Sequence, residues 1–413
     1  MSLNTAKTMR YAWLVVAMLW PVACLNYLDR LMITTMRDSI KAEITMTDAQ
    51  FGLLTSVFLW VYAFLSPFAG FLADRFSRSR MIVASLFVWS VVTWLTAHAS
   101  TFNELLWARA LMGISEACYI PAALALITDY HRGPTRSLAT GLHMSGLYGG
   151  AALGGLGGVL AEHLRWQSAF TIFGAVGVGF SLLLMFFLKD TGGASSGSQA
   201  EDKPTENVRL SSALTCLARQ GSFWLLLTYF SLLAIAYWAI YGWLPTYMGQ
   251  QFKLGQGAAG MSATAYLQFA SFVGVLVGGF WADRWIRTNL RGRLYVPFIG
   301  FCAAGPALFL AASTDVLLLA ICGLIVFGMA RGFADANNMP ILCQITERRY
   351  RATGYGVMNF TSCVVGGLMT YAAGVLNDAQ VGLGLVFKWS AAGVVVAVLL
   401  LLLVKPKKEL EGS

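Results

Sequence analysis

The chain has 413 residues, of which 57% are hydrophobic and only 12% are charged, and its mean hydropathy is +0.64. A soluble domain carries about twice that share of charged residues, so the composition excludes an ordinary water-soluble protein. The net charge of +9 does not require nucleic-acid binding, because the distribution of basic residues along the chain explains it.

Apolar runs of about 20 residues, the length at which an α-helix crosses a bilayer, recur along the whole chain. We therefore predict an all-α membrane protein with twelve transmembrane helices. In chain order, the predicted spans lie near residues 11–36, 48–73, 80–99, 103–127, 138–160, 166–188, 221–247, 258–283, 294–313, 315–340, 353–376 and 382–404.

One long polar stretch, DTGGASSGSQAEDKPTENVR at 190–209, separates the first six spans from the last six. Its glycine, serine and charged residues are typical of a flexible linker. We therefore predict three parts. They are an N-terminal six-helix bundle at 1–189, a cytoplasmic linker at 190–220 and a C-terminal six-helix bundle at 221–413.

Lysine and arginine stay on the cytoplasmic side of a membrane protein during insertion. With both termini in the cytoplasm, 21 of the 29 basic residues fall on the cytoplasmic side and five on the opposite side. We therefore predict cytoplasmic termini. The remaining three basic residues, Arg30, Arg109 and Arg331, lie inside predicted spans.

The two predicted bundles repeat each other's sequence. GFLADRF at 70–76 matches GFWADRW at 279–285, and GISEACYIP at 113–121 matches GFADANNMP at 332–340. Repeated six-span halves with a substrate site between them are the plan of alternating-access transporters.

The stretch GFLADRFSRSR resembles the loop between the second and third helices of the major facilitator superfamily, and the match recurs in the second half. The resemblance implies that superfamily's fold, with two pseudo-symmetric six-helix bundles. It also implies structural or gating roles: the glycine packs closely, the aspartate caps a neighbouring helix and the basic residues hold the cytoplasmic side. The motif residues are Gly70, Asp74 and Arg75 in the first half and Gly279, Asp283 and Arg284 in the second.

Within that superfamily, four segments resemble the anion:cation symporter family, whose members move organic anions such as sugar acids, usually with protons. The spinster family of lipid transporters has a similar first-helix D-R and fourth-helix R-x-x-x-G-x-x-E. Pro121 and the W-L-P-T-Y segment fit the symporters better. The four segments are NYLDR (26–30), R-x-x-x-G-x-x-E-A-x-x-x-P (109–121), GWLPTYM (242–248) and NF (359–360).

Charged residues in the fourth span share one helix face, because Arg109, Gly113 and Glu116 fall at i, i+4 and i+7. A charge facing lipid is costly, so this face should point into the bundle. At 1.5 Å per residue, Arg109 and Arg30 each lie about 9 Å from the outer end of their spans, and Glu116 about 20 Å. Two arginines at matching depth suit the binding of one carboxylate.

An alternative is that these charges only neutralise one another, since Asp29 and Glu116 balance Arg30 and Arg109. The same balance suits a proton-coupled site, because protonation of an acid releases an arginine for an anion. We favour function, with Glu116 as the first choice for the proton carrier and Asp29 as the second. The family resemblance implies these same roles for the two acids, substrate contact for Arg30 and importance in transport for Arg109.

Polar side chains inside the spans are candidates for binding substrate hydroxyl groups. Tyr27 lies one turn before Arg30, and the resemblance implies that Tyr62 faces the substrate. Arg331 and Asp335, at i and i+4, are expected to neutralise each other, with a role in an inner gate as the second reading. Four amides complete the candidate set, and each could equally bridge helices. They are Gln268, Asn337, Asn338 and Asn359.

The sequence thus predicts a secondary active transporter that symports an organic monocarboxylate, a hexuronate or aldonate, with protons by alternating access. The alternative is a spinster-like proton-coupled transporter of lysolipids or other amphiphiles.

An enzyme is not expected, because the spans contain no Ser-His-Asp set, HExxH motif or metal cluster. We expect no cofactor or metal, with sodium left open as the coupling ion. The expected partners are a small organic anion and the lipid bilayer of a bacterial inner membrane, without nucleic acid, and the chain should be a monomer.

Overall fold

The computed structural model describes residues 3–131, 135–190 and 210–407, and all regular structure in these ranges is helical. Twelve segments are long and apolar enough to cross a membrane, which confirms the predicted fold class. They are Met9–Thr35, Asp48–Ala69, Arg78–Thr96, Phe102–Tyr130, Leu138–His163, Trp166–Phe187, Gly221–Phe252, Gln256–Trp285, Gly292–Ala311, Leu317–Ile345, Arg351–Asp378 and Leu383–Leu402.

The chain forms two compact units. Unit 1 comprises Met1–Ser198 with Leu254–Ala265, and unit 2 comprises Gln199–Lys253 with Tyr266–Ser413. The helices of unit 1 are α1 (Leu3–Thr35), α2 (Arg37–Glu43), α3 (Asp48–Arg75), α4 (Arg78–Thr96), α5 (Phe102–Glu116), α6 (Tyr119–Tyr130), α7 (Arg136–Leu153), α8 (Leu156–His163) and α9 (Trp166–Phe187).

Unit 2 contains the helices of the second half, while α12 (Gln256–Trp285) begins in unit 1 and enters unit 2 at Tyr266. Residues 191–209 of the predicted linker lie outside the described residues, so its flexibility stays a prediction. The elements of unit 2 are α10 (Leu210–Ala218), α11 (Gly221–Phe252), α13 (Gly292–Ala311), α14 (Leu317–Ile345), η2 (Arg348–Tyr350), α15 (Arg351–Asp378) and α16 (Leu383–Leu402).

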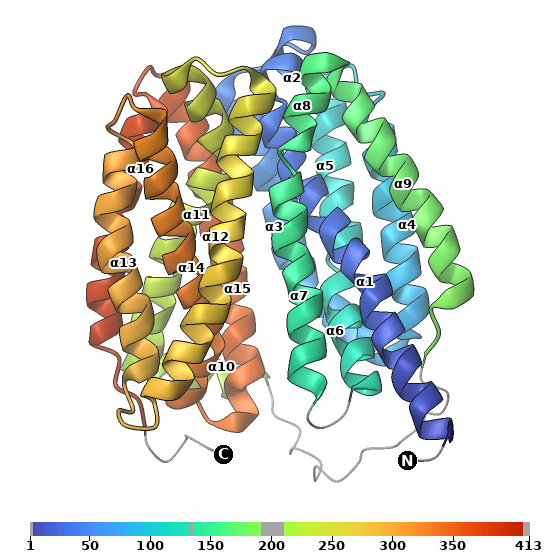
Figure 1. Ribbon diagram of the computed structural model, residues 1–413, viewed down its shortest axis with the longest axis vertical. Helices are drawn as coiled ribbons and strands as arrows, with labels where there is room; N and C mark the ends of the chain where they lie inside the picture. Colours follow the sequence, from blue (N-terminus) through green and yellow to red (C-terminus); the bar gives the residue numbers. More distant parts are fainter. Residues whose placement is uncertain (1–2, 132–134, 191–209, 408–413) are drawn as a thin grey trace. The chain divides into compact units, whose positions relative to one another are not determined.

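Glycines let the helices of unit 1 approach closely. Helix α1 packs along α7, and α4 packs along α9 (Figure 1). A Cβ atom on Gly150 of α7 would lie 2.0 Å from the backbone oxygen of Cys24 on α1. Only glycine permits that approach.

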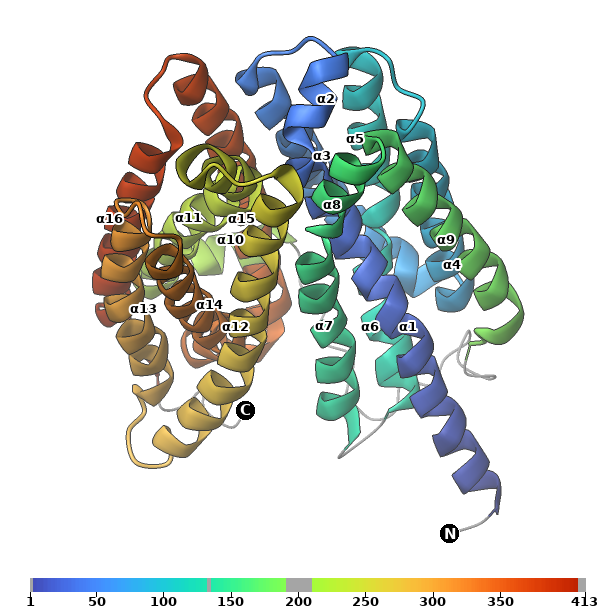
Figure 2. The same cartoon turned by 45° about the horizontal axis from the view of Figure 1, so that its top comes forward.

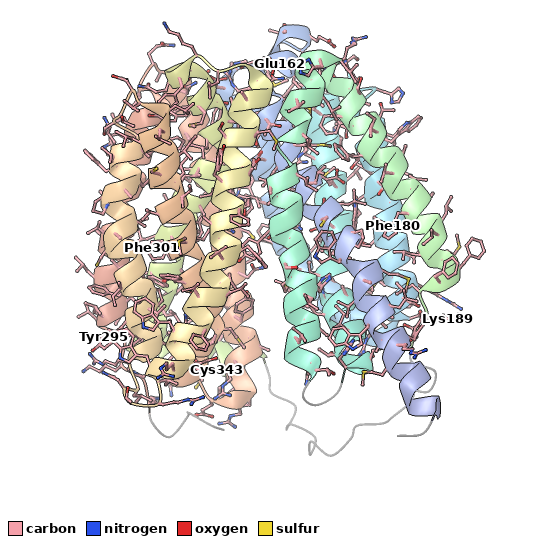
Figure 3. The ribbon with its side chains drawn as sticks, in the orientation of Figure 1. Glu162, Phe180, Lys189, Tyr295, Phe301 and Cys343 are labelled. Carbon is pink, nitrogen blue, oxygen red and sulfur yellow. The ribbon has the colours of Figure 1, made fainter. Side chains whose placement is uncertain are left out.

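The sequence repeat corresponds to the same packing device in each unit. A Cβ on Gly113 of α5 would lie 2.9 Å from the Phe58 oxygen of α3, and one on Gly332 of α14 would lie 2.2 Å from the Ser271 oxygen of α12. In unit 2, α13 packs along α14 and brings Phe301 (labelled in Figure 3) to a ring-centroid distance of 6.3 Å from Phe327.

The fourth span is interrupted just after Glu116. Helix α5 ends at that residue, and α6 starts at Tyr119 (Figure 2). Pro121 stands in the first turn of α6, where its missing N–H breaks no intrahelical hydrogen bond. The sequence thereby places an acidic side chain at a helix end in the middle of a membrane span.

Candidate functional site

Four charged side chains are buried within helices α1 and α5 of unit 1. Asp29 and Arg30 of α1 are 2% and 6% exposed, whereas Arg109 and Glu116 of α5 are fully buried. Buried charges persist only where partners or hydrogen bonds compensate the loss of water. The contacts of each group therefore indicate what it can do.

Arg30 and Glu116 form a direct ion pair. The Nε of Arg30 donates to Oε2 of Glu116 at 2.7 Å, and the Nδ2 of Asn26 donates to the same oxygen at 2.9 Å. Glu116 Oε1 and Arg30 Nη2 have no hydrogen-bond partner among the described residues. The pair therefore leaves one acceptor and one donor unused, in a place where unused polar atoms are costly.

Three aromatic rings surround the guanidinium group of Arg30. Its central carbon lies 4.8 Å from the ring centroid of Tyr27, 5.0 Å from that of Phe58 and 4.6 Å from that of Tyr62. Such cation–π contacts hold the flat group in position without using its N–H donors. The structure thus brings the predicted residues Tyr27, Tyr62 and Arg30 together with Glu116.

Arg109 has a different environment. Its Nη1 donates to the backbone oxygen of Asp29 at 3.3 Å, and its Nε donates to the backbone oxygen of Leu54 at 3.4 Å. It therefore bridges α5 to α1 and α3 and forms no ion pair with Glu116. The structure does not bring both arginines onto one carboxylate, and substrate contact by Arg109 stays a prediction.

Asp29 faces another helix. Its Oδ2 accepts a hydrogen bond from Thr93 of α4 at 3.2 Å, and its Oδ1 has no partner among the described residues. Successive residues of a helix point about 100° apart, which explains why Asp29 contacts α4 while Arg30 contacts α5. Asp29 is thus separate from the Arg30–Glu116 pair.

The predicted amides of unit 2 differ in their contacts. Asn337 donates to the backbone oxygens of Phe333 and Gly278, at 2.8 and 3.5 Å, and so bridges α14 to α12. Gln268 is buried and accepts from the Tyr241 hydroxyl at 3.4 Å. Asn338 is also buried, with an Oδ1 that lacks a hydrogen-bond partner. Asn359 is partly exposed on α15.

One predicted pairing lies on α14, and the repeated motif forms another that was not predicted. The Nε of Arg331 lies 3.4 Å from Oδ2 of Asp335, as expected for an i, i+4 pair. Asp283 is exposed and pairs with Arg293, in the first turn of α13, at 3.2 Å. Arg75 and Arg284 are exposed, and a Cβ on Gly279 would make only ordinary contacts. The surroundings of Gly70 and Asp74 lie outside the described part of the structure.

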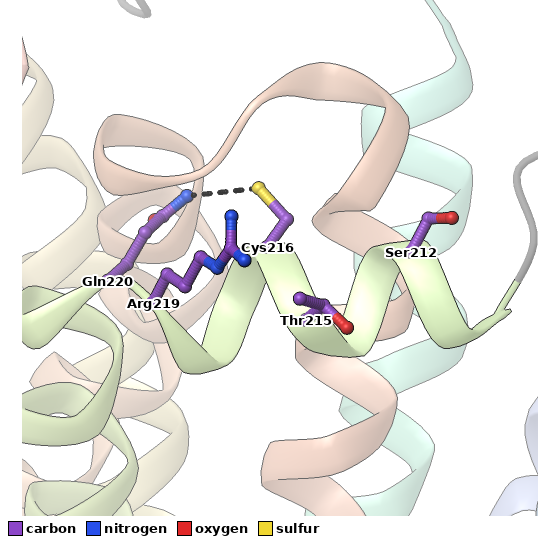
Figure 4. Close-up of a pocket in the computed structure, with 5 residues that line it drawn as sticks. All are labelled: Ser212, Thr215, Cys216, Arg219 and Gln220. Carbon is purple, nitrogen blue, oxygen red and sulfur yellow. Dashed lines mark hydrogen bonds between the residues drawn. The ribbon is translucent and has the colours of Figure 1, made fainter.

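A pocket lined by polar side chains lies along α10. It measures about 510 Å³, and the Nε2 of Gln220 contacts the Sγ of Cys216 at 3.6 Å (Figure 4). It contains one charged side chain and no predicted site residue, and we assign it no function. The lining residues are Ser212, Thr215, Cys216, Arg219 and Gln220.

Sequence reasoning missed three residues of the site in unit 1. Asn26 could have been selected from the sequence, because it is a polar residue in an apolar span, four positions before Arg30. Thr93 gave a weaker indication, since threonine is common in membrane helices. Phe58 gave none, because nothing distinguishes it from the other phenylalanines of the spans.

The comparisons with known proteins agree with this architecture. The family model described as Major Facilitator Superfamily matches residues 19–371. A probable sulfoacetate transporter of Cupriavidus necator is 29% identical, with 94% of each chain covered. A bacterial homologue of the human lysosomal transporter spinster, solved in an inward-facing conformation, has a TM-score of 0.76 at 22% identity, with 95% of each chain covered.

Two further relatives bear the names of the two alternatives weighed from the sequence, spinster and a sugar-acid transporter. Protein spinster homolog 1 of Xenopus tropicalis is 28% identical over 91% of this chain and 75% of its own length. A D-galactonate transporter of Escherichia coli is 25% identical over 90% of this chain and 91% of its own length.

Proposed function

The chain belongs to the Major Facilitator Superfamily, and from this premise we propose that it is a secondary active transporter that symports an organic anion with protons. It is an integral multi-pass membrane protein with twelve spans. The family and the relatives above are transporters, not enzymes.

The observation that carries the proposal is the Arg30–Glu116 pair. Arg30 is fixed by aromatic faces and keeps an N–H donor that no described residue uses. A planar guanidinium group with a free donor edge is suited to a carboxylate or sulfonate. Glu116 occupies part of the same edge and therefore competes with such an anion.

That competition provides a means of proton coupling. When Glu116 binds a proton, its charge disappears and its ion pair with Arg30 weakens. Arg30 then becomes available to the solute anion. Loss of the proton restores the pair and displaces the anion. Asp29, buried beside Thr93, is the second candidate for the proton carrier.

A sugar acid is the proposed solute, a hexuronate or an aldonate. The relatives named for sulfoacetate and D-galactonate support an organic anion. The alternative, a spinster-like transporter of lysolipids, is supported by the similarity to spinster homolog 1. We also propose a bacterial inner membrane with both termini in the cytoplasm, supported by the bacterial relatives and the distribution of basic residues.

Transport by the purified chain in proteoliposomes tests the proposal. Labelled D-galactonate, D-glucuronate and lysophosphatidylcholine should each be offered with and without an imposed pH gradient. We expect accumulation of at least one of the acids only when the side from which it is taken up is acidic, and none with Arg30→Gln. Transport of the lysolipid alone would favour the spinster-like alternative, and accumulation that ignores the pH gradient would exclude proton coupling.

A further inference from the structure

Unit 2 contains a second arginine that is held by tyrosine rings. The guanidinium carbon of Arg331 on α14 lies 5.1 Å from the ring centroid of Tyr237 and 4.6 Å from that of Tyr241, both on α11. Its carboxylate partner, Asp335, is on its own helix. The same three parts, an arginine, tyrosine faces and a carboxylate, form the site around Arg30 in unit 1.

Two buried side chains of unit 2, on α12 and α11, each have a polar atom without a hydrogen-bond partner among the described residues. Tyr241 donates to Oε1 of Gln268, and this leaves the Nε2 donor of Gln268, a residue only 1% exposed, without a partner. The hydroxyl of Tyr229 on α11 is also fully buried and has no hydrogen-bond partner among the described residues. Buried donors without partners need a physical explanation.

An anion bound beside Arg331 would give the Nε2 donor of Gln268 a partner. Arg331 supplies a positive charge and Gln268 supplies an N–H, and both contact Tyr241. We propose that Arg331 and Gln268 form an anion subsite within unit 2, which takes a carboxylate or sulfonate group of the transported solute and replaces Asp335 as the counter-ion. This inference rests on the proposed function and extends it: an organic anion with a second anionic group should bind more tightly than the sugar acids named there, which have one.

The competing explanation is a structural ion pair. Arg331 and Asp335 are one helical turn apart, and such pairs contribute little by themselves. The 3.4 Å separation of Nε and Oδ2 is longer than that of the Arg30–Glu116 pair, and the side chain of Asp335 is 28% exposed. The two explanations differ in what happens when both charges are removed together.

Binding to the full chain in lipid nanodiscs tests the subsite. The probes are sulfoacetate, with two anionic groups, and D-galactonate, with one. With Arg331→Gln, we expect the affinity for sulfoacetate relative to D-galactonate to fall about tenfold, because a charge-assisted hydrogen bond is lost. Asp335→Asn should raise that ratio several-fold, because it removes the competing carboxylate.

The double variant Arg331→Gln/Asp335→Asn separates the two explanations. If Arg331 forms a subsite, the double variant should have the same lowered affinity for sulfoacetate relative to D-galactonate as Arg331→Gln. If the two residues form only a structural pair, the double variant should have the wild-type ratio of affinities. Gln268→Leu should lower the ratio about threefold while Tm and the elution volume stay unchanged. The subsite alone would be overturned by the following pair of results. Arg331→Gln elutes normally and keeps the wild-type ratio of the two affinities, while the separate variant Arg30→Gln loses D-galactonate binding. Binding of neither probe by the wild type would overturn the proposed function as well.

Discussion

The substitution Glu116→Gln removes the charge that competes for Arg30 while keeping the side chain's size. The Nε of Arg30 now donates to Glu116 at 2.7 Å, and an incoming anion must displace that contact. A hydrogen bond to a charged group contributes about 1.5–3 kcal/mol. Its removal should therefore tighten anion binding by about 10- to 100-fold, at 1.4 kcal/mol per factor of ten.

The same substitution should destabilise the ligand-free protein. Both side chains of the pair are at most 7% exposed, so water screens the charge left on Arg30 only weakly. Removing one partner of a buried pair costs about 3–5 kcal/mol. A bound anion would compensate that charge, so ligand should raise the Tm of the variant more than that of the wild type.

Calorimetry in nanodiscs would measure the affinity, and proteoliposomes would separate two kinds of transport. We expect Glu116→Gln to exchange labelled for unlabelled substrate but to lose accumulation driven by a pH gradient. The matched control is Arg30→Gln/Glu116→Gln, in which neither member of the pair is charged. It should recover Tm yet fail to bind the anion.

Two results would refute this reasoning. If Glu116→Gln still concentrates substrate against its gradient, the coupling acid is another group, with Asp29 the first to test. If the variant neither binds nor exchanges while the double variant recovers Tm, the pair serves only the stability of unit 1.

The remaining predictions concern stability. Gly150→Ala should lower the free energy of unfolding by about 1–3 kcal/mol or more, because its Cβ would meet the Cys24 backbone. Gly179→Ala, with open space around it, is the control and should be neutral or stabilising in a thermal melt. Asn26→Ala should cost about 1–2 kcal/mol in the same assay, through the lost hydrogen bond to Glu116; an unchanged Tm would contradict this. Hydrogen bonds from Gln167, Arg165 and Trp166 lower the pKa of Glu43, so its contribution to stability is present at neutral pH and is lost as Glu43 protonates in acid. Glu43→Gln should abolish that part of the acid dependence of Tm, and an identical pH profile would count against it.

The twelve spans were predictable because a bilayer imposes both length and apolar composition on every helix. The repeat was predictable because Gly113 and Gly332 serve the same close helix contact, which no other residue permits. The interruption at Ala117 and Cys118 was not predicted. Pro121 indicates a disturbance nearby, but proline also occurs inside α1, α3 and α11 without ending those helices.

The candidate site was predictable in its charged members and not in their pairing. Charges inside apolar spans are conspicuous in a sequence, so Arg30, Arg109 and Glu116 could be selected directly. Which arginine meets Glu116 depends on the rotation and tilt of α1 and α5, and these are set by packing with the other helices. The i, i+7 spacing put Arg109 and Glu116 on one face, yet Arg109 donates to backbone carbonyls instead.

The difference between the two arginines bears on how coupling would work. The four buried charges of α1 and α5 sum to zero, and an anion bound at Arg30 would leave one uncompensated negative charge there. Protonation of Glu116 removes that charge, so one proton restores neutrality for the anionic group bound at Arg30. Arg109 donates to the backbone oxygens of Asp29 and Leu54, whereas Arg30 donates to Glu116 itself, so Arg30 is the arginine that protonation of Glu116 would release. Arg109 instead supplies the positive charge that balances Asp29 as long as that acid stays ionised.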